Sequence, residues 1–367
     1  MVAVLWFPLV SCQGQNADEV KAIDSPEFKA LLESYGELMT IAGMGKEDKG
    51  RNSWKPSYEG RLGTEVELSN PHITMQDDAG NYYIADKQSN RILKVDPKGI
   101  LTTHAGTGRG GFSGEEGRAT EIDLDYPNGL HVLPSGVVYI LDNFNNRVRR
   151  VDRDGNLTTI FVDEKRFHHG RGLWVSSDEK LIYYVGSGVR NSRLMKWTQE
   201  GGSVEIAGGM LDLAYMTVDP DGNIIVTEQG RNFVHRISPD GKKKKTIAGN
   251  GTTAEPVNGR PATEIGLFEV RGIALRPDGS FFVCTHKGGD IVFVDSKGIA
   301  NKFIDGVGRG NVHAGDGEPV ANPGDKISEP RAVALAPNGD LIITCSDYGF
   351  VRVVKKKPDA TDPSGDR

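Results

Sequence analysis

Hydrophobic residues lie in short runs that follow tight turns, and one such unit recurs six times along the chain. The copies are spaced 43 to 60 residues apart. They read Gly80-NYYIAD, Gly136-VVYILD, Glu179-KLIYYVG, Gly222-NIIVTE, Gly279-SFFVCT and Gly339-DLIITC. Runs of this length, opened by Gly, Asp or Pro turns, predict β-strands. A period of this size predicts a repeat architecture.

Each copy contains further strands around this central run. The first copy has ITMQDD before it, RILKVD after it and then ILTTHAG, and the next four copies follow the same order. Four short strands with tight turns are typical of a propeller blade. The sixth copy ends after its third strand, and Leu38-MTIAG near the N-terminus matches Lys245-TIAG of the fourth copy. We therefore predict an all-β fold, a six-bladed β-propeller with four-stranded blades, closed by an N-terminal strand that completes the last blade.

Composition and charge narrow the functional classes. The chain has 47 Gly and 18 Pro among 367 residues, which argues against a helical bundle. Its formal charge of −6 argues against a nucleic-acid partner. The three cysteines, Cys12, Cys284 and Cys345, are too few for a disulfide framework, so the core must hold by packing. We expect a monomer.

The N-terminus has the pattern of an export signal. Met1 to Val10 is apolar but too short to span a bilayer, and Leu9-Val10-Ser11-Cys12 resembles the lipobox of bacterial lipoproteins. No Lys or Arg precedes the apolar run, so a chance apolar end with Cys12 as a free thiol is the alternative. The first interpretation places the protein in the periplasm or cell envelope, in contact with a membrane only through a lipid anchor on Cys12.

The chain divides into four segments on this basis. Ser25 and Pro26 predict the start of a short helix with apolar Phe28, Leu31 and Leu32, which ends at Gly36. The segments are a signal over 1–12, a linker with this helix over 13–36, the propeller over 37–357 and a disordered tail over 358–367.

Two long segments carry a resemblance to a known family. AGTGRGGFSGEEGRATEIDLDYPNGL begins at Ala105 and AGNGTTAEPVNGRPATEIGLFEVRGIAL begins at Ala248. Together with Asp142-NFNNRVRRVD, these segments resemble the NHL repeat, and the resemblance covers nearly all of the chain beyond residue 37. It implies a propeller fold. It implies no single function, because the family includes scaffolds, RNA binders and enzymes.

The repeats place the candidate site on one face. Turns inside the blades are tight, whereas four links between blades are long and lie on the opposite face, where binding loops are expected. The first strand of each blade begins there. Alignment gives one equivalent position per blade, which we call the rim: His72, Asn128, Arg171, Ala214, Arg271 and Arg331. Three arginines at one channel mouth predict a site for a small anionic molecule, a sugar or a protein segment.

Two other interpretations of the rim arginines stay open. Carboxylates at the ends of the second strands, Asp86, Asp142 and Glu228, could pair with these arginines, or with Arg91 and Arg147, and join neighbouring blades. The arginines could also line a wet channel without a ligand.

The competing function is a metal-assisted lyase or lactonase that acts on a carboxylated or sugar-derived substrate at the same site. Its acid or base would be one of His72, His286, Asp142 and Glu228. Pro71-His72 is similar to one metal-binding histidine of the amidating lyases, but the other rim positions are not histidines. A zinc site of three rim histidines is therefore excluded.

Other ligand sets for a divalent cation remain. Asn128, Asp142 and Glu228 are similar to the Glu, Asn and Asp set of propeller lactonases and would hold calcium or another hard cation. His168, His169, His286 and His313 could converge through loops with His72 to hold zinc. The sequence thus names calcium or zinc as the alternative cofactor.

Overall fold

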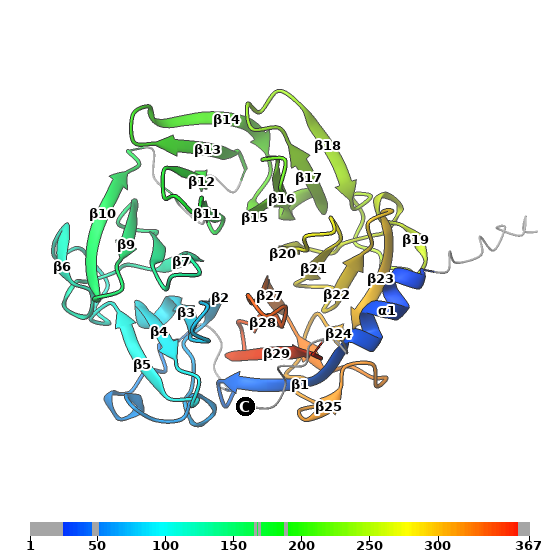
Figure 1. The fold of residues 1–367 in the computed structure, drawn as a ribbon, viewed down its shortest axis with the longest axis horizontal. Coiled ribbons are helices and arrows are strands. Elements are labelled where there is room, and N and C mark those ends of the chain that lie inside the picture. Colours follow the sequence, from blue (N-terminus) through cyan, green and yellow to red (C-terminus); the bar gives the residue numbers. More distant parts are fainter. Residues whose placement is uncertain (1–24, 46–50, 165–166, 168–169, 187–189, 359–367) are drawn as a thin grey trace, which may run out of the picture.

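The computed structural model describes residues 25–45, 51–164, 167, 170–186 and 190–358. Figure 1 shows six sheets arranged in a ring around a central channel, which confirms the six-bladed β-propeller. Outside these residues lie the predicted signal, Cys12, His168, His169 and all of the predicted tail except Pro358. Among the described residues, no helix has both the length and the apolar character needed to cross a membrane.

Each blade is an antiparallel sheet whose first strand lies innermost. The strands of blades 1 to 3 are β2 (Pro71–Gln76), β3 (Tyr82–Asp86), β4 (Arg91–Val95) and β5 (Leu101–Ala105); β7 (Pro127–Val132), β8 (Val138–Asp142), β9 (Arg147–Val151) and β10 (Asn156–Val162); and β11 (Leu173–Val175), β12 (Leu181–Gly186), β13 (Ser192–Thr198) and β14 (Gly202–Met210). Those of blades 4 to 6 are β15 (Leu213–Val218), β16 (Ile224–Glu228), β17 (Phe233–Ile237) and β18 (Lys244–Ala248); β20 (Val270–Leu275), β21 (Phe281–Thr285), β22 (Ile291–Val294) and β23 (Ile299–Ile304); and β27 (Pro330–Leu335), β28 (Leu341–Cys345), β29 (Phe350–Lys356) and β1 (Tyr35–Ala42).

The N-terminal strand closes the ring as predicted. β1 pairs antiparallel with β29, with Leu38 opposite Val354, and so supplies the outer strand of blade 6. The helix α1 (Pro26–Ser34) precedes it, and Ser25 caps this helix by accepting a hydrogen bond from the Phe28 N–H. Both chain ends of the propeller therefore meet in one sheet, which leaves no open seam between the last blade and the first.

The long links contain short elements that the repeat pattern did not predict. Outer strands β6 (Glu116–Arg118), β19 (Arg260–Pro261) and β25 (Glu318–Pro319) extend blades 2, 5 and 6, and β24 (Gly306–Val307) pairs in parallel with β26 (Ile327–Ser328). Single 3-10 turns are η1 (Pro56–Tyr58), η2 (Gly63–Glu65), η3 (Lys87–Ser89), η4 (Ala119–Glu121), η5 (Gln229–Arg231) and η6 (Ala262–Glu264). The links are therefore ordered extensions of the blades.

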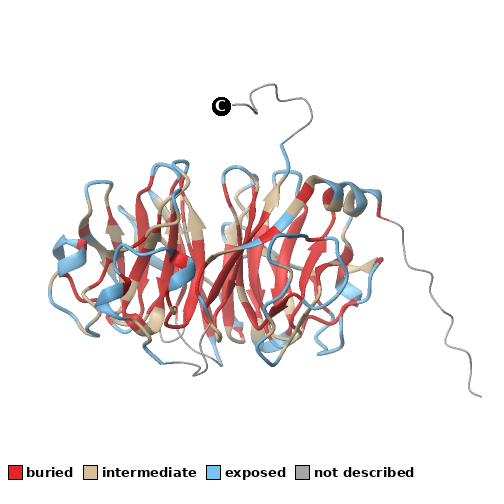
Figure 2. Ribbon diagram, turned by 90° about the horizontal axis from the view of Figure 1, so that it is seen from below, coloured by how far each residue is buried: buried red, intermediate tan, exposed pale blue. Residues whose placement is uncertain are grey.

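The core lies between neighbouring blades. The second strands are buried almost completely, and Figure 2 shows buried segments through the depth of every blade and exposed residues at the turns and loops. Cys284 and Cys345 are free, fully packed thiols in β21 and β28, and burial raises the pKa of each to about 12. They are core residues, as the sequence indicated.

The innermost strands approach one another closely. A Cβ on Gly272 would lie 2.4 Å from the Val333 nitrogen of the next blade, and a Cβ on Gly129 would lie 2.6 Å from the Arg171 carbonyl oxygen. Only glycine allows two backbones to come this near. Both glycines directly follow a rim residue. In each pair the glycine lets the inner strands come close together, and the rim residue before it places a side chain at the mouth.

Candidate functional site

The rim residues owe their orientation to a repeated backbone irregularity. In five blades the pairing of the first two strands shifts register at the rim position, for example between Pro71 and Thr74. Such bulges turn side chains away from the regular pleat and are common next to functional sites.

A strained residue stands two positions before the rim in the same five blades. Positive φ angles occur at Asn70, Tyr126, Asp212, Glu269 and Glu329, with values of 70°, 54°, 48°, 51° and 45°. Non-glycine residues seldom adopt this conformation, and such strain clusters at functional sites. The bulge and the preceding left-handed residue together form the mouth of the channel.

The structure brings the three rim arginines together at this mouth. Arg171 and Arg271 are at least nine-tenths buried, and the positive charges of Arg171, Arg271 and Arg331 all act on His72. Burial, followed by the charges of Arg331 and Arg171, lowers the pKa of Arg271, whose guanidinium still stays charged at neutral pH. The alignment of the repeats thus located a real cluster of cations.

The carboxylates that face these arginines come from the loops. Arg171 lies 3.5 Å from Asp212, Arg271 lies 2.9 Å from Glu269, and Arg331 lies 3.1 Å from Asp347. Glu269 also pairs with Lys287. Of the carboxylates named in the alternative interpretation, Asp142 pairs with Arg149 and Glu228 with Arg231. The charges of Asp86 and Asp142 act on Arg91 and Arg147, the other partners named there.

A lysine that the sequence analysis did not single out completes the cluster. Lys87 is the first residue of η3, directly after Asp86, and its ammonium lies 5.0 Å from the centre of the Tyr126 ring. Burial, reinforced by the charges of Arg331, Arg171 and Arg271, lowers the pKa of Lys87 to about 8. Nothing in the repeat pattern marks Lys87, because the residues after the second strand differ from blade to blade.

Charges at the mouth do not cancel among the residues described by the structure. The cations are Lys87, Arg171, Arg271, Lys287 and Arg331, and the carboxylates are Asp212, Glu269, Glu329 and Asp347. Positive charge dominates around His72 and Lys87, since the charges of Arg331, Arg171 and Arg271 act on both.

Within the described part of the chain, several buried polar atoms at the mouth have no hydrogen-bond partner. They are Nε of Arg171, Nε and Nη1 of Arg271, Nδ1 of His72 and Oδ1 of Asn128. Buried polar groups without a partner are rare in folded proteins, and each one calls for an explanation.

The two candidate histidines are neutral. Burial first, and then the surrounding cations, hold the pKa of His72 and of His286 well below the usual histidine range. His286 lies with Nδ1 3.2 Å from the Glu329 carbonyl oxygen. This contact favours a proton on Nδ1 and leaves Nε2 as the free base or ligand atom.

Tyr215 closes the channel beneath the mouth. It belongs to β15 of blade 4, and its hydroxyl donates a hydrogen bond of 2.7 Å to the carbonyl oxygen of His72 in blade 1, on the opposite side of the ring. Below Tyr215 lies a separate cavity of about 150 Å³ lined mainly by apolar residues such as Ile73 and Met216. The hydrogen bond from Tyr215 therefore spans the ring next to the rim.

Asp142 and Glu228 serve their own blades. Asp142 is fully buried, pairs with Arg149 at 3.0 Å and accepts a hydrogen bond from the Asp125 N–H. Glu228 accepts hydrogen bonds from His235, Arg231 and the Leu211 N–H. Each carboxylate thus holds the segment that leads into its blade.

These positions do not bring the predicted oxygen ligands together. Asp142 lies in blade 2 and Glu228 in blade 4, with blade 3 between them. Burial raises the pKa of Asp142 to about 6, against the effect of the Asp125 N–H and of Arg149. A cation site of Asn128, Asp142 and Glu228 has no geometric support in this arrangement.

The structure offers a different metal-ligand group. Atoms of His286, Glu329 and Asp347 lie within 4.8 Å of one another at the mouth. His313 does not join them, because it stacks on Phe350 and lies 2.7 Å from the Thr40 hydroxyl at the outer edge of blade 6. The expected convergence of loop histidines is thus limited, within the described residues, to His72 and His286 near the arginines.

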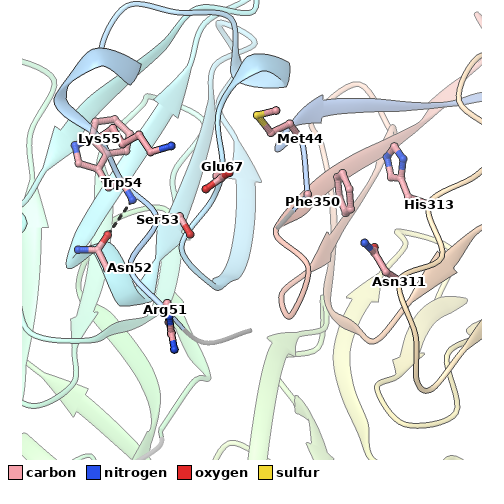
Figure 3. A pocket seen from close by; sticks show the side chains of 11 residues that line it. Met44, Arg51, Asn52, Ser53, Trp54, Lys55, Glu67, Asn311, His313 and Phe350 are labelled. Carbon is pink, nitrogen blue, oxygen red and sulfur yellow. Dashed lines mark hydrogen bonds between the residues drawn. The ribbon is translucent and has the colours of Figure 1, made fainter. Parts of the chain in front are cut away.

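A larger cleft of about 720 Å³ lies where blade 6 meets blade 1. Figure 3 shows Trp54 and Lys55 on one side of it and Phe350 and His313 on the other, with Glu67 between them. Its lining contains none of the buried unpartnered polar atoms found in the described residues. The mouth is therefore the stronger candidate site despite the size of this cleft.

Comparison with known proteins supports the fold and leaves the family open. No family model matches the chain. A stretch of 131 residues is 30% identical to the chloroplastic protein SUPPRESSOR OF QUENCHING 1 of Arabidopsis thaliana and covers 35% of this chain but only 12% of that protein. The match therefore shows similarity in one region and not over the full length of either protein.

Solved structures extend the likeness over most of the chain. One, a protein of unknown function from Bacteroides thetaiotaomicron, has a TM-score of 0.66 at 15% identity and covers 87% of this chain and 76% of its own. Another is an auxiliary nutrient binding protein from Bacteroides thetaiotaomicron, with a TM-score of 0.61 at 11% identity, 88% of this chain and 76% of its own. At such identities the likeness defines the class, a six-bladed β-propeller, and nothing finer.

Proposed function

We propose that this protein is an exported propeller of the NHL type that binds a small anionic molecule at the mouth of its channel. The observation that carries the proposal is the cluster of buried Arg171 and Arg271 with partly buried Arg331, whose positive charges all act on His72. Guanidinium groups suit carboxylate and phosphate oxygens because their N–H donors form a fixed fork.

A binding role agrees with the arrangement of the site. The mouth lies on a closed ring, which the hydrogen bond from Tyr215 to the His72 carbonyl oxygen spans. The similarity to an auxiliary nutrient binding protein also supports a binding role and an exported location.

Calorimetric titration at low ionic strength tests the proposal. Sodium salts of carboxylates, phosphate and sulfate serve as probes, and we expect at least one to bind with a Kd below about 1 mM. Arg271→Gln and Arg331→Gln should each weaken binding at least tenfold, whereas Arg153→Gln, in an exposed turn on the other face, should leave it unchanged. Absence of binding by every probe, or equal binding by all variants, would refute the anion site.

The second candidate function is a metal-assisted lyase or lactonase, and the group of His286, Glu329 and Asp347 favours it. One nitrogen and two carboxylates form a donor set that zinc accepts. When bound, the cation would polarise a substrate carbonyl or activate water. Two observations weigh against this candidate: Asp347 already pairs with Arg331, and a dication would add to the positive charge of the mouth.

Metal analysis separates the two functions. Purified protein should contain less than one zinc or calcium per chain, and chelator should not change its melting temperature. A stoichiometric metal whose loss lowers the melting temperature in the parent, but not in Glu329→Gln, would support the enzyme instead.

A further inference from the structure

The cleft between blades 6 and 1 is a second concave site, separate from the mouth. Its volume of about 720 Å³ lies within the range of about 300 to 1,000 Å³ that is typical of small-molecule sites, and no rim residue lines it. Residues 46–50, which connect the lining residues Gly45 and Arg51, lie outside the described residues. The site is therefore defined by its eleven described lining residues alone.

One wall of this cleft is the half-buried indole ring of Trp54. The Arg91 guanidinium lies 5.0 Å from the centre of this ring, and the Tyr58 ring meets it at 80° with 6.0 Å between the ring centres. Neither Arg91 nor Tyr58 lines the cleft. Their contacts thus fix the indole from outside the cleft and leave its remaining surface to a ligand.

The opposite wall is a stacked pair of rings, Phe350 and His313 (Figure 3). Their centres lie 3.9 Å apart and their planes differ by 14°. A Cβ on Gly45 would lie 2.8 Å from Cζ of Phe350, so glycine is needed for the chain to pack against this ring. His313 is held further by the contact of 2.7 Å from its Nε2 to the Thr40 hydroxyl. Both walls are therefore ring surfaces whose positions are set before a ligand arrives.

Polar side chains with unused hydrogen-bonding capacity lie between these walls. Those of Glu67, Ser53 and Asn311 line the cleft and make no hydrogen bond within the described chain. A carboxylate only accepts, whereas a hydroxyl and an amide both donate and accept. The cleft thus offers donors and acceptors side by side.

The charges of the lining have both signs. Arg51 and Lys55 are positive and Glu67 is negative, and the charge of Glu67 acts on Lys55. His313 is neutral at pH 7, because burial first, and then the charge of Arg352, lower its pKa.

This lining selects against several classes of ligand. A purely apolar ligand would take water from the polar groups without replacing its hydrogen bonds. An anion would meet Glu67, and a cation would meet Arg51 and Lys55. A neutral ligand rich in hydroxyl groups suits all of them, because each hydroxyl donates one hydrogen bond and accepts others.

We infer that this cleft binds a saccharide, with the C–H face of one sugar ring against Trp54 and ring hydroxyls on Glu67, Ser53 and Asn311. A sugar ring combines a flat apolar face with hydroxyls at its edge, and an aromatic ring offers an apolar surface of matching shape. The inference goes beyond the proposed anion site, since the two sites share no residue.

Calorimetric titration at pH 7 tests the inference with cellobiose, maltose and lactose as probes. We expect at least one of them to bind with a Kd below about 5 mM. Cyclohexanol, which has an apolar ring and a single hydroxyl, should bind at least about tenfold more weakly, because it leaves most polar groups of the cleft without a partner.

Variants assign the binding to the cleft. Trp54→Ala should weaken the bound disaccharide at least about tenfold, whereas Phe112→Ala, which removes an exposed ring from the link before blade 2, should not. Glu67→Ala should weaken it about tenfold, and Glu65→Ala, two positions away in an exposed pair with Arg61, should leave it unchanged. If Trp54→Ala does not fold, the comparison of the two glutamate variants decides.

The outcomes keep this site apart from the proposed function. Failure of all three disaccharides to bind, or equal binding of cyclohexanol, would overturn the inference. Disaccharide binding that is lost in Arg271→Gln and kept in Trp54→Ala would overturn it as well, because the sugar would then lie at the mouth. Titration of anions in Trp54→Ala should match the parent protein, so the anion site stands or fails independently.

Discussion

We expect the binding of an anion at the mouth to weaken as the pH rises through 8, because Lys87 loses its proton in this range. Its pKa is lowered to about 8 because the ammonium is buried among Arg331, Arg171 and Arg271. A bound carboxylate would offset this repulsion and return the pKa toward the ordinary value of 10.5. The ligand then binds the protonated form more tightly, so affinity should fall as the pH rises through 8.

The size of the effect follows from proton linkage. At pH 9 only about a tenth of the free protein keeps Lys87 protonated, whereas nearly all of the complex does, so the affinity for a carboxylate should be about tenfold lower than at pH 7. The contribution of Lys87 to the stability of the unliganded protein depends on pH in the opposite direction. A lysine whose folded pKa lies below its unfolded value favours unfolding at low pH, so its contribution to stability improves between about pH 8 and 10.5.

Isothermal titration calorimetry at pH 7, 8 and 9, with constant ionic strength, measures this dependence. Lys87→Arg is the matched control, because an arginine keeps its charge across the range and should limit the change in affinity to about threefold. A wild-type affinity that is constant from pH 7 to 9, or a tenfold decrease that persists in Lys87→Arg, would refute this reasoning.

Two further predictions concern the ring itself. Tyr215→Phe removes the bond across the channel and should lower the free energy of unfolding by about 1 kcal/mol in chemical denaturation, while Tyr126→Phe, which removes a hydroxyl without a hydrogen-bond partner in the described structure, should change it by less than about 0.5 kcal/mol. Equal effects would show that the cross-channel bond is not stabilising. Gly272→Ala places a Cβ 2.4 Å from the Val333 nitrogen and should cost about 1 to 3 kcal/mol, whereas Gly36→Ala, whose nearest neighbour would be 3.6 Å away, should not alter the denaturation midpoint by a comparable amount. A stable Gly272→Ala variant would mean that the inner strands can move apart.

The fold could be predicted because the same sequence pattern of short strands and tight turns recurs in each blade. Six copies fix the strand order and the inner position of the first strand, and the match between Leu38-MTIAG and Lys245-TIAG identified the strand that closes the ring. The rim was predictable for the same reason, since its residues occupy one register. Strand endings also agree, as the second strands end at Asp86, Asp142 and Glu228.

The partners of the rim arginines were not predictable in the same way. Asp347 follows β28 in a loop, whereas Asp212 and Glu269 stand two positions before the rim, in a left-handed conformation that strands do not adopt. Alternation along a strand therefore gives no rule for where their side chains point. The repeat alignment does place Asp212 and Glu269 in one column, and a search of that column would have found them.

The charges of the rim arginines also determine whether the group of His286, Glu329 and Asp347 can hold a metal. Glu329 and Asp347 resemble metal ligands only when the cations around them are ignored, for Arg331 pairs with Asp347 and the charges of Arg271 and Arg331 act on His286. A dication placed there would meet an already positive site, whereas a monoanion would neutralise it. Because a buried charge without compensation is costly, the mouth favours the proposed anion over a cation. A metal would become favourable only after a ligand had brought in more than one negative charge, so any metal chemistry at this site would depend on the anion that binds first.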